Sequence, residues 1–566
     1  MRRFRYEPVL YGLAFILALT IRVIKLGALP LTDAEARWAL QALGVAQGTQ
    51  PALGSQPAYI LLTSVLFYGL GAGTNFLARL VPALTGSAIV LVPGLFTHRL
   101  KPRASVILAF LLALDPGLVA LSRQAGSSVL AVTFSLLAWG FWENRRAAWA
   151  GIFAGLALLS GPVLWAGLLG LALTWAIGQA LYIRRSPTTS PEGIHPAPGA
   201  WSTALWFAVG TIVVAGTLFF LAPNGLGAWA SALPDYVAGW FTPSGIPIGL
   251  MLFSLIAYQP LGVLLALVAA ARGLRKGSRR IMRLSLWLLV ALFVALFYPA
   301  RQISDLAWML IPLWSLSALE LARDLSVRSD ERREVLGVVA LTVLILAFVW
   351  INFLGLLQTS APSPDATLRT WLLFGSFFLL FISLMLVAVG WSIRSALLGA
   401  IWGLTAALGI YSFSAMTGAA GLRVIPDAVD LWRPGGNLPE SDLLQLTIDQ
   451  VSDWSLKNVN AQPVTIVGID SPSLQWLLRG HTVSKTAALD VSSEPPIVIT
   501  PDQNNPALVA HYRGQNFVWR QNPMWDQTGL SDWIRWLGFH QVLQNPQKVI
   551  VWVRSDLFID SAAPKP

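Results

Sequence analysis

The sequence predicts a mainly α-helical protein that crosses a membrane many times and ends in an α/β domain outside the membrane. The 566 residues are 55% hydrophobic and only 12% charged, whereas soluble domains have about 25% charged residues. Apolar runs close to the roughly 20 residues that a spanning helix needs recur through the first part of the chain. The charge balance then reverses. Residues 1–415 carry 28 Lys and Arg against 14 Asp and Glu, and residues 416–566 carry 11 against 14.

An ordinary water-soluble globule is therefore excluded. The chain has no cysteine, which excludes disulfides, thiolate zinc sites and cysteine nucleophiles. The basic residues are concentrated in the helical part, where membrane orientation accounts for them, so we expect no nucleic-acid partner. No N-x-[ST] sequence occurs in the chain, which fits a prokaryotic origin.

We expect about thirteen membrane spans. The first follows Arg2, Arg3 and Arg5 and has no small-residue cleavage site behind it, which indicates a retained anchor. The expected spans are 8–26, 80–98, 104–121, 128–142, 148–161, 163–182, 203–222, 246–270, 282–299, 306–322, 335–356, 370–390 and 395–415.

One apolar segment, 57–71, is too short for a typical span and suits an interfacial helix within a first outer loop of residues 27–79. If it lies flat, the loops on the side of the N-terminus hold 21 Lys and Arg and the opposite loops hold seven. If it spans, this bias inverts. The positive-inside rule therefore predicts a flat helix, a cytoplasmic N-terminus and an extracytoplasmic C-terminus in a multi-pass cell-membrane protein.

A transmembrane domain over 1–418 and an extracytoplasmic α/β domain over 419–566 follow from the drop in hydropathy near residue 420. In this second domain short β-rich runs alternate with helical stretches, which predicts a mainly parallel sheet. The expected strands are 464–469, 496–500, 517–520 and 549–553, and the expected helices lie near 473–479, 506–512 and 532–544. The Pro/Ser/Thr-rich segment 186–200 is expected to be a connector. His481, His511 and His540 lack metal-ligand spacing. Trp519, Trp525, Trp533 and Trp536 either line a sugar-binding face or pack in the core.

Few charges of the helical part are expected outside the membrane, and their densest group is the first outer loop. It contains Asp33 and Glu35, which Arg22 and Lys25 precede. Two carboxylates separated by one residue in a loop can hold a divalent cation, or one can act as a general base beside an anionic leaving group. Residues 32–35 also fit a helix N-terminus, with Thr32 or Asp33 as the cap. Composition alone favours capping.

The sequence around this motif resembles the GT-C superfamily of membrane glycosyltransferases. The resemblance covers about residues 8–320 and is closest to the branch of protein O-mannosyltransferases and lipid A aminoarabinose transferases. It rests on the acidic motif after the first span, the apolar segment that begins Gln56-Pro57-Ala58-Tyr59, and Phe76-Leu77-Ala78-Arg79-Leu80-Val81-Pro82 at the second span. Further support comes from residues 111–116 with 122–123, from 155–162 and from 306–314.

The resemblance implies a hexosyl- or pentosyltransferase. Such an enzyme takes a sugar from a polyprenyl-phosphate donor and transfers it to a protein, lipid or glycan acceptor on the outer face. It implies Asp33 as the catalytic base and Glu35 as its partner for the acceptor or a metal. Some relatives use a divalent metal cation there. Hence a metal held by Asp33 and Glu35 is an open expectation.

A phosphate leaving group needs cations at the outer boundary, and arginine binds phosphate in a bidentate manner. The candidates are Arg301 first, then Arg79, Arg123 and Lys25. Each has an alternative role. Arg301 could pair with Asp305 four residues later, and Arg79 or Lys25 could snorkel to lipid headgroups.

One departure from the family concerns the second outer loop, where relatives carry an acidic residue shortly after the arginine equivalent to Arg123. Here the sequence is Gln124-Ala125-Gly126-Ser127-Ser128. Asp115 could replace that carboxylate as a metal ligand, although an Asp-Pro turn that ends a helix is the simpler interpretation.

The leading hypothesis is thus a glycosyltransferase with a lipid-linked donor. The alternative is a non-catalytic scaffold or a lipid or glycan transporter derived from the same fold. A transporter should show buried charges or broken helices in its spans and repeated halves. The sequence shows neither clear internal repeats nor buried charges in the spans, while the missing acidic residue favours the scaffold.

Overall fold

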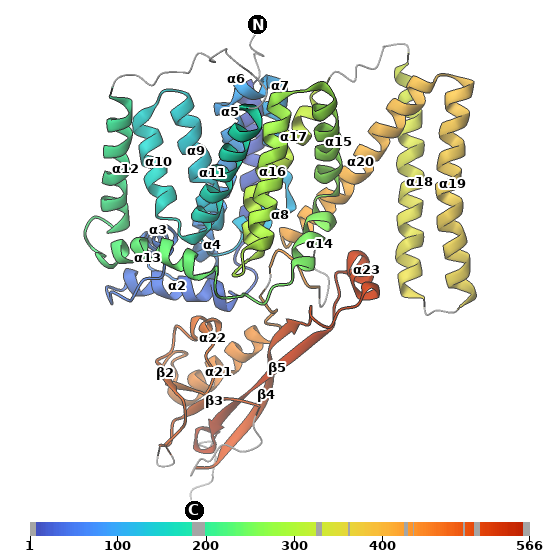
Figure 1. Ribbon diagram of the computed structural model, residues 1–566. Helices are drawn as coiled ribbons and strands as arrows, with labels where there is room; N and C mark the ends of the chain where they lie inside the picture. Colours follow the sequence, from blue (N-terminus) through green and yellow to red (C-terminus); the bar gives the residue numbers. More distant parts are fainter. Residues whose placement is uncertain are drawn as a thin grey trace, which may run out of the picture.

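The computed structural model describes residues 7–183, 199–323, 331–359, 363–423, 428–433, 435–490, 493–502 and 510–558. These residues form a bundle of helices with a smaller, sheet-containing part against one end (Figure 1). The expected connector at 186–200, apart from its last two residues, and most of the expected helix at 506–512 lie outside the described residues.

The helical part ends at Ala419 and is mainly α-helical, as expected. Its elements are α1 (Glu7–Val23), α2 (Asp33–Ala46), α3 (Pro57–Leu70), α4 (Asn75–Ala88), η1 (Ile89–Leu91), α5 (Val92–Leu95), α6 (Thr97–Leu100), α7 (Pro102–Leu114), α8 (Pro116–Ser122), α9 (Ser128–Glu143), α10 (Ala147–Leu158), α11 (Pro162–Ile183), α12 (Ala200–Gly216), α13 (Asn224–Ala238), α14 (Ile248–Tyr258), α15 (Pro260–Lys276), α16 (Arg279–Phe297), η2 (Ile303–Leu306), α17 (Ala307–Leu321), α18 (Arg332–Gln358), α19 (Pro364–Gly390) and α20 (Ile393–Ala419).

Every expected span coincides with one of these helices or with consecutive helices. By length and composition, six of the described helices can cross a membrane, or up to eight if each of two bent pairs counts as one span. The number is below thirteen because several apolar helices are short. Helices of 10–17 residues such as α9, α10 and α12 are at most about 26 Å long, less than the roughly 30 Å of hydrocarbon.

Two spans are broken. The chain bends by 57° between α7 and α8 and by 90° between α14 and α15, in both cases just before a proline, which disfavours helical backbone in the residue that precedes it. Arg22 of α1 is fully buried and donates to the carbonyls of Leu112 and Ala113, which α7 leaves open where it ends, each at 3.2 Å. The expectation that the spans hold no buried charge was therefore wrong, because Arg22 caps a broken helix.

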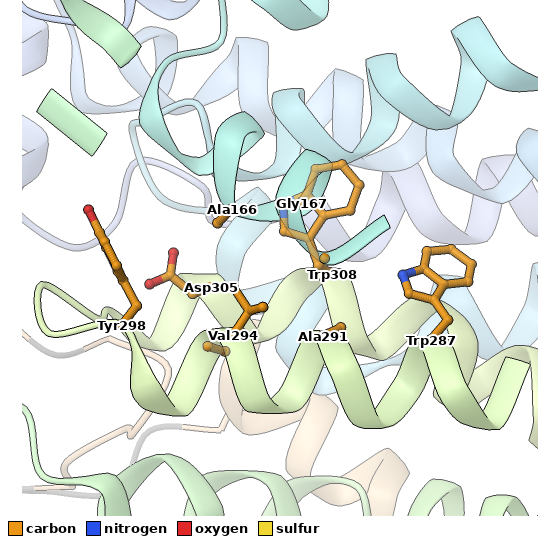
Figure 2. Close-up of a pocket in the computed structure, with 10 residues that line it drawn as sticks. Ala166, Gly167, Trp287, Ala291, Val294, Tyr298, Asp305 and Trp308 are labelled. Atoms are coloured by element: carbon orange, nitrogen blue, oxygen red, sulfur yellow. The ribbon is translucent and has the colours of Figure 1, made fainter. Parts of the chain in front are cut away.

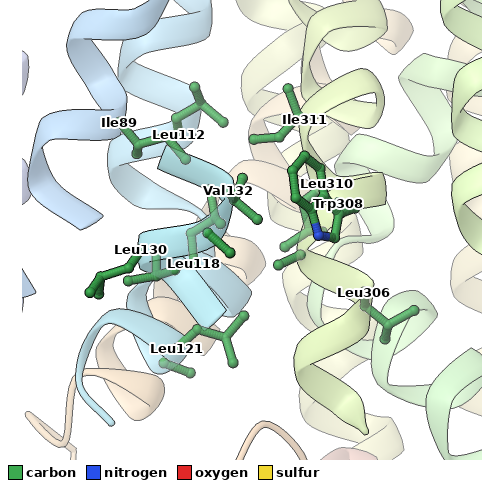
Figure 3. Close-up of a cluster of buried hydrophobic side chains, with 14 of the residues drawn as sticks. Ile89, Leu112, Leu118, Leu121, Leu130, Val132, Leu306, Trp308, Leu310 and Ile311 are labelled. Atoms are coloured by element: carbon green, nitrogen blue, oxygen red, sulfur yellow. The ribbon is translucent and has the colours of Figure 1, made fainter. Parts of the chain in front are cut away.

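The core of the bundle lies around α17, whose residues from Ala307 to Ala318 are all buried. Figure 3 shows apolar side chains of the α7–α9 segment facing those of η2 and α17. The long helix α19, by contrast, is almost entirely exposed, with 6% of its apolar window buried. The central helices thus fix the outer ends of the bundle, whereas α18 and α19 lie at its margin (Figure 1).

The C-terminal part contains a five-stranded sheet with the strand order β2-β1-β3-β5-β4. The pairs β1–β2 and β1–β3 are parallel, and β3–β5 and β4–β5 are antiparallel. The sheet is therefore mixed and not mainly parallel, because β4 and β5 form a long antiparallel ribbon. The elements are α21 (Ser441–Leu456), β1 (Val464–Val467), α22 (Pro472–Leu477), β2 (Val483–Thr486), β3 (Ile497–Pro501), β4 (Tyr512–Pro523), α23 (Leu530–Phe539), β5 (Gln544–Arg554) and η3 (Ser555–Phe558).

Tryptophans join this C-terminal part to the bundle. Trp476 of α22 donates to the Asn75 side chain at 2.7 Å, and Trp536 of α23 packs against Phe253 and Tyr258 of α14. Trp519 and Trp536 are buried, and Trp525 stacks on Trp533 with 5.1 Å between ring centroids. Of the two roles open for these tryptophans, core packing is the one observed for Trp519 and Trp536.

Replacing Trp536 with Ala should loosen the C-terminal part from the bundle. The side chain is 1% exposed, and truncating a core tryptophan costs roughly 3–5 kcal/mol. Limited proteolysis of membranes that contain the full chain should therefore release the C-terminal part faster from Trp536→Ala. Trp454→Ala is the control, since that side chain is 54% exposed. Equal cleavage rates for the two variants would contradict this role of Trp536.

Candidate active site

The first outer loop folds around a helix N-terminus. Thr32 caps α2: its hydroxyl accepts from the Glu35 N–H, and the Glu35 carboxylate accepts from the Thr32 N–H at 3.0 Å. This reciprocal arrangement is a capping box, which satisfies N–H groups that a helix start leaves free. Asp33 and Glu35 are thus the first and third residues of α2 and stand at the positive end of its dipole.

Glu35 forms a buried ion pair with Arg79 of α4. Glu35 Oε1 lies 2.7 Å from Arg79 Nε, and Oε2 lies 2.8 Å from Nη2. Only 4% of the Glu35 side chain and 2% of the Arg79 side chain are exposed. Glu35 Oε1 also accepts from the Ala125 N–H at 3.0 Å. Both carboxylate oxygens are therefore occupied by protein donors.

Arg79 is equally occupied. Besides its two bonds to Glu35, it donates to the carbonyls of Leu26 at 3.3 Å, Leu29 at 2.7 Å and Pro30 at 2.9 Å. A guanidinium has five N–H groups, and all five have acceptors here. The pair therefore ties the end of α1 and the start of α2 to α4.

The charge state of Glu35 follows from this environment. Burial alone would raise the pKa of Glu35, but the charge and hydrogen bonds of Arg79 outweigh burial and lower the pKa to about 2. The carboxylate stays ionised at neutral pH and is a weak base.

Asp33 faces the C-terminal part. Its Oδ1 accepts from the Ser471 hydroxyl at 2.8 Å, the Ser473 hydroxyl at 2.6 Å and the Ser473 N–H at 3.0 Å. Its Oδ2 forms an ion pair with Arg520 of β4. Burial alone would raise the pKa of Asp33, but the hydrogen bonds from Ser473 and Ser471 and the charge of Arg520 hold it below its usual value. Oδ1 is saturated, whereas Oδ2 keeps one lone-pair direction.

The two carboxylates do not converge, because Glu35 binds Arg79 inside the bundle and Asp33 binds the C-terminal part. Within the ranges that the structure describes, no group of three or more His, Asp or Glu side chains could hold a metal ion. With their oxygens engaged by arginine, hydroxyl and amide donors, Asp33 and Glu35 do not fit a divalent cation, which needs several free oxygen ligands.

The other outer cations lie nearby but serve different elements. Arg123 donates to the carbonyls of Ile21, Arg22, Ile24 and Lys25, at distances from 2.8 to 3.3 Å, and so caps the end of α1. The Lys25 side chain is exposed and has no hydrogen bond or ion pair to any described residue.

Arg301 belongs to the junction of α16 and η2. Its Nε donates to the Ile246 carbonyl at 2.8 Å. The alternative pairing with Asp305 is not formed, since the Asp305 carboxylate accepts from the Gln302 N–H at 2.8 Å instead. Among the described residues, no hydrogen bond or ion pair joins Arg301 to Asp33, Glu35 or Arg79, and its Nη2 has no acceptor.

Asp115 lies at the break between α7 and α8. Its Oδ2 accepts from the Leu118 N–H at 2.6 Å, which makes it the N-cap of α8. Its Oδ1 accepts from the Trp314 indole at 2.8 Å and from Gln259 at 3.4 Å. The carboxylate is buried and bound by neutral donors, as the Asp-Pro turn predicts.

Two hollows lie near these residues. A crevice lined by Asp305, Tyr298 and Trp308 (Figure 2) has a volume of about 10 Å³, room for about one water and too little for a sugar. A wider groove of about 450 Å³ lies between α2 and the C-terminal part. Its lining is Leu40, Leu43, Gly44, Gln47, Gln475, Arg479, His481, Val483 and Lys485.

Four residues at this end of the bundle were not foreseen from the sequence, namely Ser471, Ser473, Arg520 and Arg433. The Trp432 carbonyl accepts from Gln124 at 2.5 Å, and Gly435 lies against Thr32, so Arg433 lies between the first two outer loops. Its side chain has no hydrogen bond or ion pair to a described residue. Nothing local in the sequence marks these contacts, which span more than 300 residues.

Comparison with solved structures gives full-length matches. ArnT from Cupriavidus metallidurans bound to undecaprenyl phosphate superposes with a TM-score of 0.56 at 14% identity, over 99% of this chain and 100% of that chain. Its apo state gives 0.54 at 14% identity, over 98% and 99%. The chain has the GT-C fold.

The apo oligosaccharyltransferase of Archaeoglobus fulgidus also matches, with a TM-score of 0.38 at 14% identity, over 85% of this chain and 64% of that chain. No protein-family model matches the chain, and no curated protein matches its sequence. The likeness to ArnT is therefore found by comparing structures, at 14% sequence identity, and it includes the C-terminal part.

Replacing Glu35 with Gln should destabilise the chain by roughly 3–5 kcal/mol, because Arg79 would be left buried without its counter-charge. The folded-state pKa of about 2 is below that of an unfolded Glu. The contribution of Glu35 is therefore complete above about pH 5 and is lost as the pH falls toward the folded-state pKa. Thermal unfolding in detergent across this pH range measures the difference from the unmodified chain.

The matched control is Asp470→Asn, whose carboxylate is 91% exposed in a surface ion pair and should contribute little. If Glu35→Gln and Asp470→Asn shift the melting temperature equally at neutral pH, the Glu35–Arg79 pair does not have the structural role described above.

Proposed function

We propose that the chain is an integral-membrane glycosyltransferase that moves a sugar from a polyprenyl-phosphate donor to an acceptor on the extracytoplasmic face. The observation that carries this proposal is the end-to-end match to ArnT, which was solved with undecaprenyl phosphate. The end of the bundle that faces the C-terminal part adds support. It holds the carboxylate of Asp33, whose Oδ2 keeps one lone-pair direction, together with arginines whose N–H groups are not all engaged by described residues. The sugar and the acceptor, whether protein, lipid or glycan, are left open.

The proposed orientation has a cytoplasmic N-terminus and an extracytoplasmic C-terminal part. The sheet and α2 lie at one end of the bundle, and α6 lies at the other (Figure 1). Basic side chains such as Arg99, Arg275 and Lys276 belong to α6 and the end of α15. This distribution agrees with a cytoplasmic assignment for the end that carries α6.

The proposed reaction is a single displacement with Asp33 as the base. The acceptor hydroxyl donates its proton to Asp33 Oδ2, and its oxygen bonds to the anomeric carbon. The bond from that carbon to the phosphate oxygen breaks, and its electron pair leaves with the polyprenyl phosphate. Glu35 takes no part in this step, since both of its oxygens are engaged by the fold, and no step passes through a metal ion.

The leaving phosphate needs cations with free donors. Arg79 has none left, and Arg123 directs Nη1 and Nη2 to four carbonyls at the end of α1. Three cations carry N–H groups without acceptors among the described residues. They are Lys25, Arg433 and Arg301, the last of these at Nη2. Our proposal therefore assigns the donor phosphate to Arg301, Lys25 and Arg433, with Arg123 and Arg79 supporting the loops that carry them.

Asp33→Asn should reduce transfer at least about 100-fold, the lower range for loss of a general base, while donor binding is retained. Purified protein in liposomes with a radiolabelled polyprenyl-phosphate sugar and a membrane extract as acceptor measures the transfer. Asp453→Asn is the control because Asp453 is an exposed residue of α21. Undiminished transfer by Asp33→Asn would overturn the assignment of the base.

Arg433→Gln should weaken the binding of undecaprenyl phosphate about 10-fold or more, the effect expected for one charge-assisted hydrogen bond. Fluorescence titration of the detergent-solubilised protein with undecaprenyl phosphate measures the dissociation constant. Arg535→Gln removes an exposed arginine of α23 and should leave it unchanged. An identical constant for Arg433→Gln and the unmodified chain would remove Arg433 from the site.

A non-catalytic or transport-related protein of the same fold is the second candidate. The broken spans and the buried Arg22 and Asp115 are features expected of transporters, and the occupied carboxylates favour a scaffold. Binding of undecaprenyl phosphate without any sugar transfer by the unmodified chain would favour this candidate over the enzyme.

A further inference from the structure

The carboxylate of Asp33 is held by groups from a distant part of the chain. Among the described residues its four donors belong to Ser471, Ser473 and Arg520, which follow it by 438 to 487 residues. The side chains of Arg520 and Asp33 are 22% and 25% exposed, so the pair lies in a partly enclosed junction. The helices of the bundle itself contribute no hydrogen bond to this carboxylate among the described residues.

The holding groups are themselves fixed. Ser471 caps α22, its hydroxyl lies 2.9 Å from the Ser473 hydroxyl, and it accepts from the Trp519 indole at 3.3 Å. Trp519 is buried, and Trp476 in the same helix is anchored to Asn75. Arg520 directly follows Trp519 in β4. The C-terminal part therefore presents a rigid set of donors to one face of α2.

We propose that Ser473 and Arg520 are positioning residues for Asp33, so that the C-terminal part completes the active site instead of merely covering it. Ser473 saturates Oδ1 from one side, and Arg520 holds Oδ2. As a result, the remaining lone pair of Oδ2 is the one that receives the acceptor proton. The inference rests on the proposed function, because it assumes that Asp33 is the base.

The charges around Asp33 make this role measurable. Arg520 faces Asp33 from β4, and α22 offers only hydroxyl and amide donors. Two other charged residues lie at this end of the bundle but are directed to other partners. Glu35 of α2 pairs with Arg79, and the charge of Arg433, in the segment 428–433, acts on Glu35. Opposite charge and hydrogen bonds to the ionised form each favour that form. Removing them should make Asp33 harder to ionise, so transfer should fail at a higher pH.

The experiment is a pH profile of transfer for the full chain in liposomes, with the same radiolabelled donor. In Arg520→Gln, the acid limb of kcat/KM should move up by about one pH unit or more, with the KM for the donor unchanged. Ser473→Ala should move it in the same direction by less, since its N–H remains. Arg520→Lys should restore much of the original profile. Arg513→Gln, which removes a cation from the same strand where it lies over Phe558, should leave the profile unchanged.

The outcomes separate the inference from the function on which it rests. If the unmodified chain transfers sugar and the profiles of Arg520→Gln and Ser473→Ala superpose on it, the positioning role is overturned and the proposed function stands. If the unmodified chain transfers no sugar, both are overturned. If Arg520→Gln fails to fold, Ser473→Ala and Arg520→Lys decide, since a shift for Ser473→Ala supports the role and an unshifted profile overturns it.

Discussion

The buried ion pair between Glu35 and Arg79 is the interaction on which the end of the bundle next to the C-terminal part depends. Two charges removed from water are costly unless their geometry is close and their remaining polar atoms are satisfied. Here every N–H of Arg79 has an acceptor, and both oxygens of Glu35 accept hydrogen bonds. The pair joins the end of α1, the start of α2, α4 and the loop before α9, and thereby sets the direction of α2.

The direction of α2 decides what Asp33 can do. Successive residues of an α-helix are separated by about 100° around its axis, so residues 33 and 35 project about 200° apart. With Glu35 turned into the bundle, Asp33 must face outward, where the C-terminal part supplies Ser471, Ser473 and Arg520. One acidic motif therefore supplies two different carboxylates, one in an ion pair inside the bundle and one held by the C-terminal part.

The same geometry explains which predictions from the sequence succeeded. Apolar runs placed the helices, and the predicted helix N-terminus with Thr32 or Asp33 as its cap is confirmed, with Thr32 as the cap. The idea that both carboxylates act together assumed a loop, and the helical twist separates them. Buried Arg22 lay within an apolar run, yet nothing local showed that a proline break in α7 would leave carbonyls for it to cap.

The contacts made by the C-terminal part could not be predicted from the sequence for a different reason. Ser471 and Arg520 carry no motif, and their roles arise only when a mixed sheet places α22 and β4 side by side against α2. A pattern with period 2 or 3.6 reports which face of an element is buried, but not which distant element covers it.

Charge balance at this end gives the last step of the argument. Arg79 is neutralised by Glu35 and Arg520 by Asp33, while Arg123 is directed to the carbonyls at the end of α1. Arg301, Arg433 and Lys25 carry positive charge that no described carboxylate neutralises by an ion pair. Cations without a paired carboxylate favour a bound anion, and our proposal assigns the donor phosphate to these three. The proposal therefore depends on the cations that the fold leaves unpaired among the described residues, and not on the total basicity of the chain.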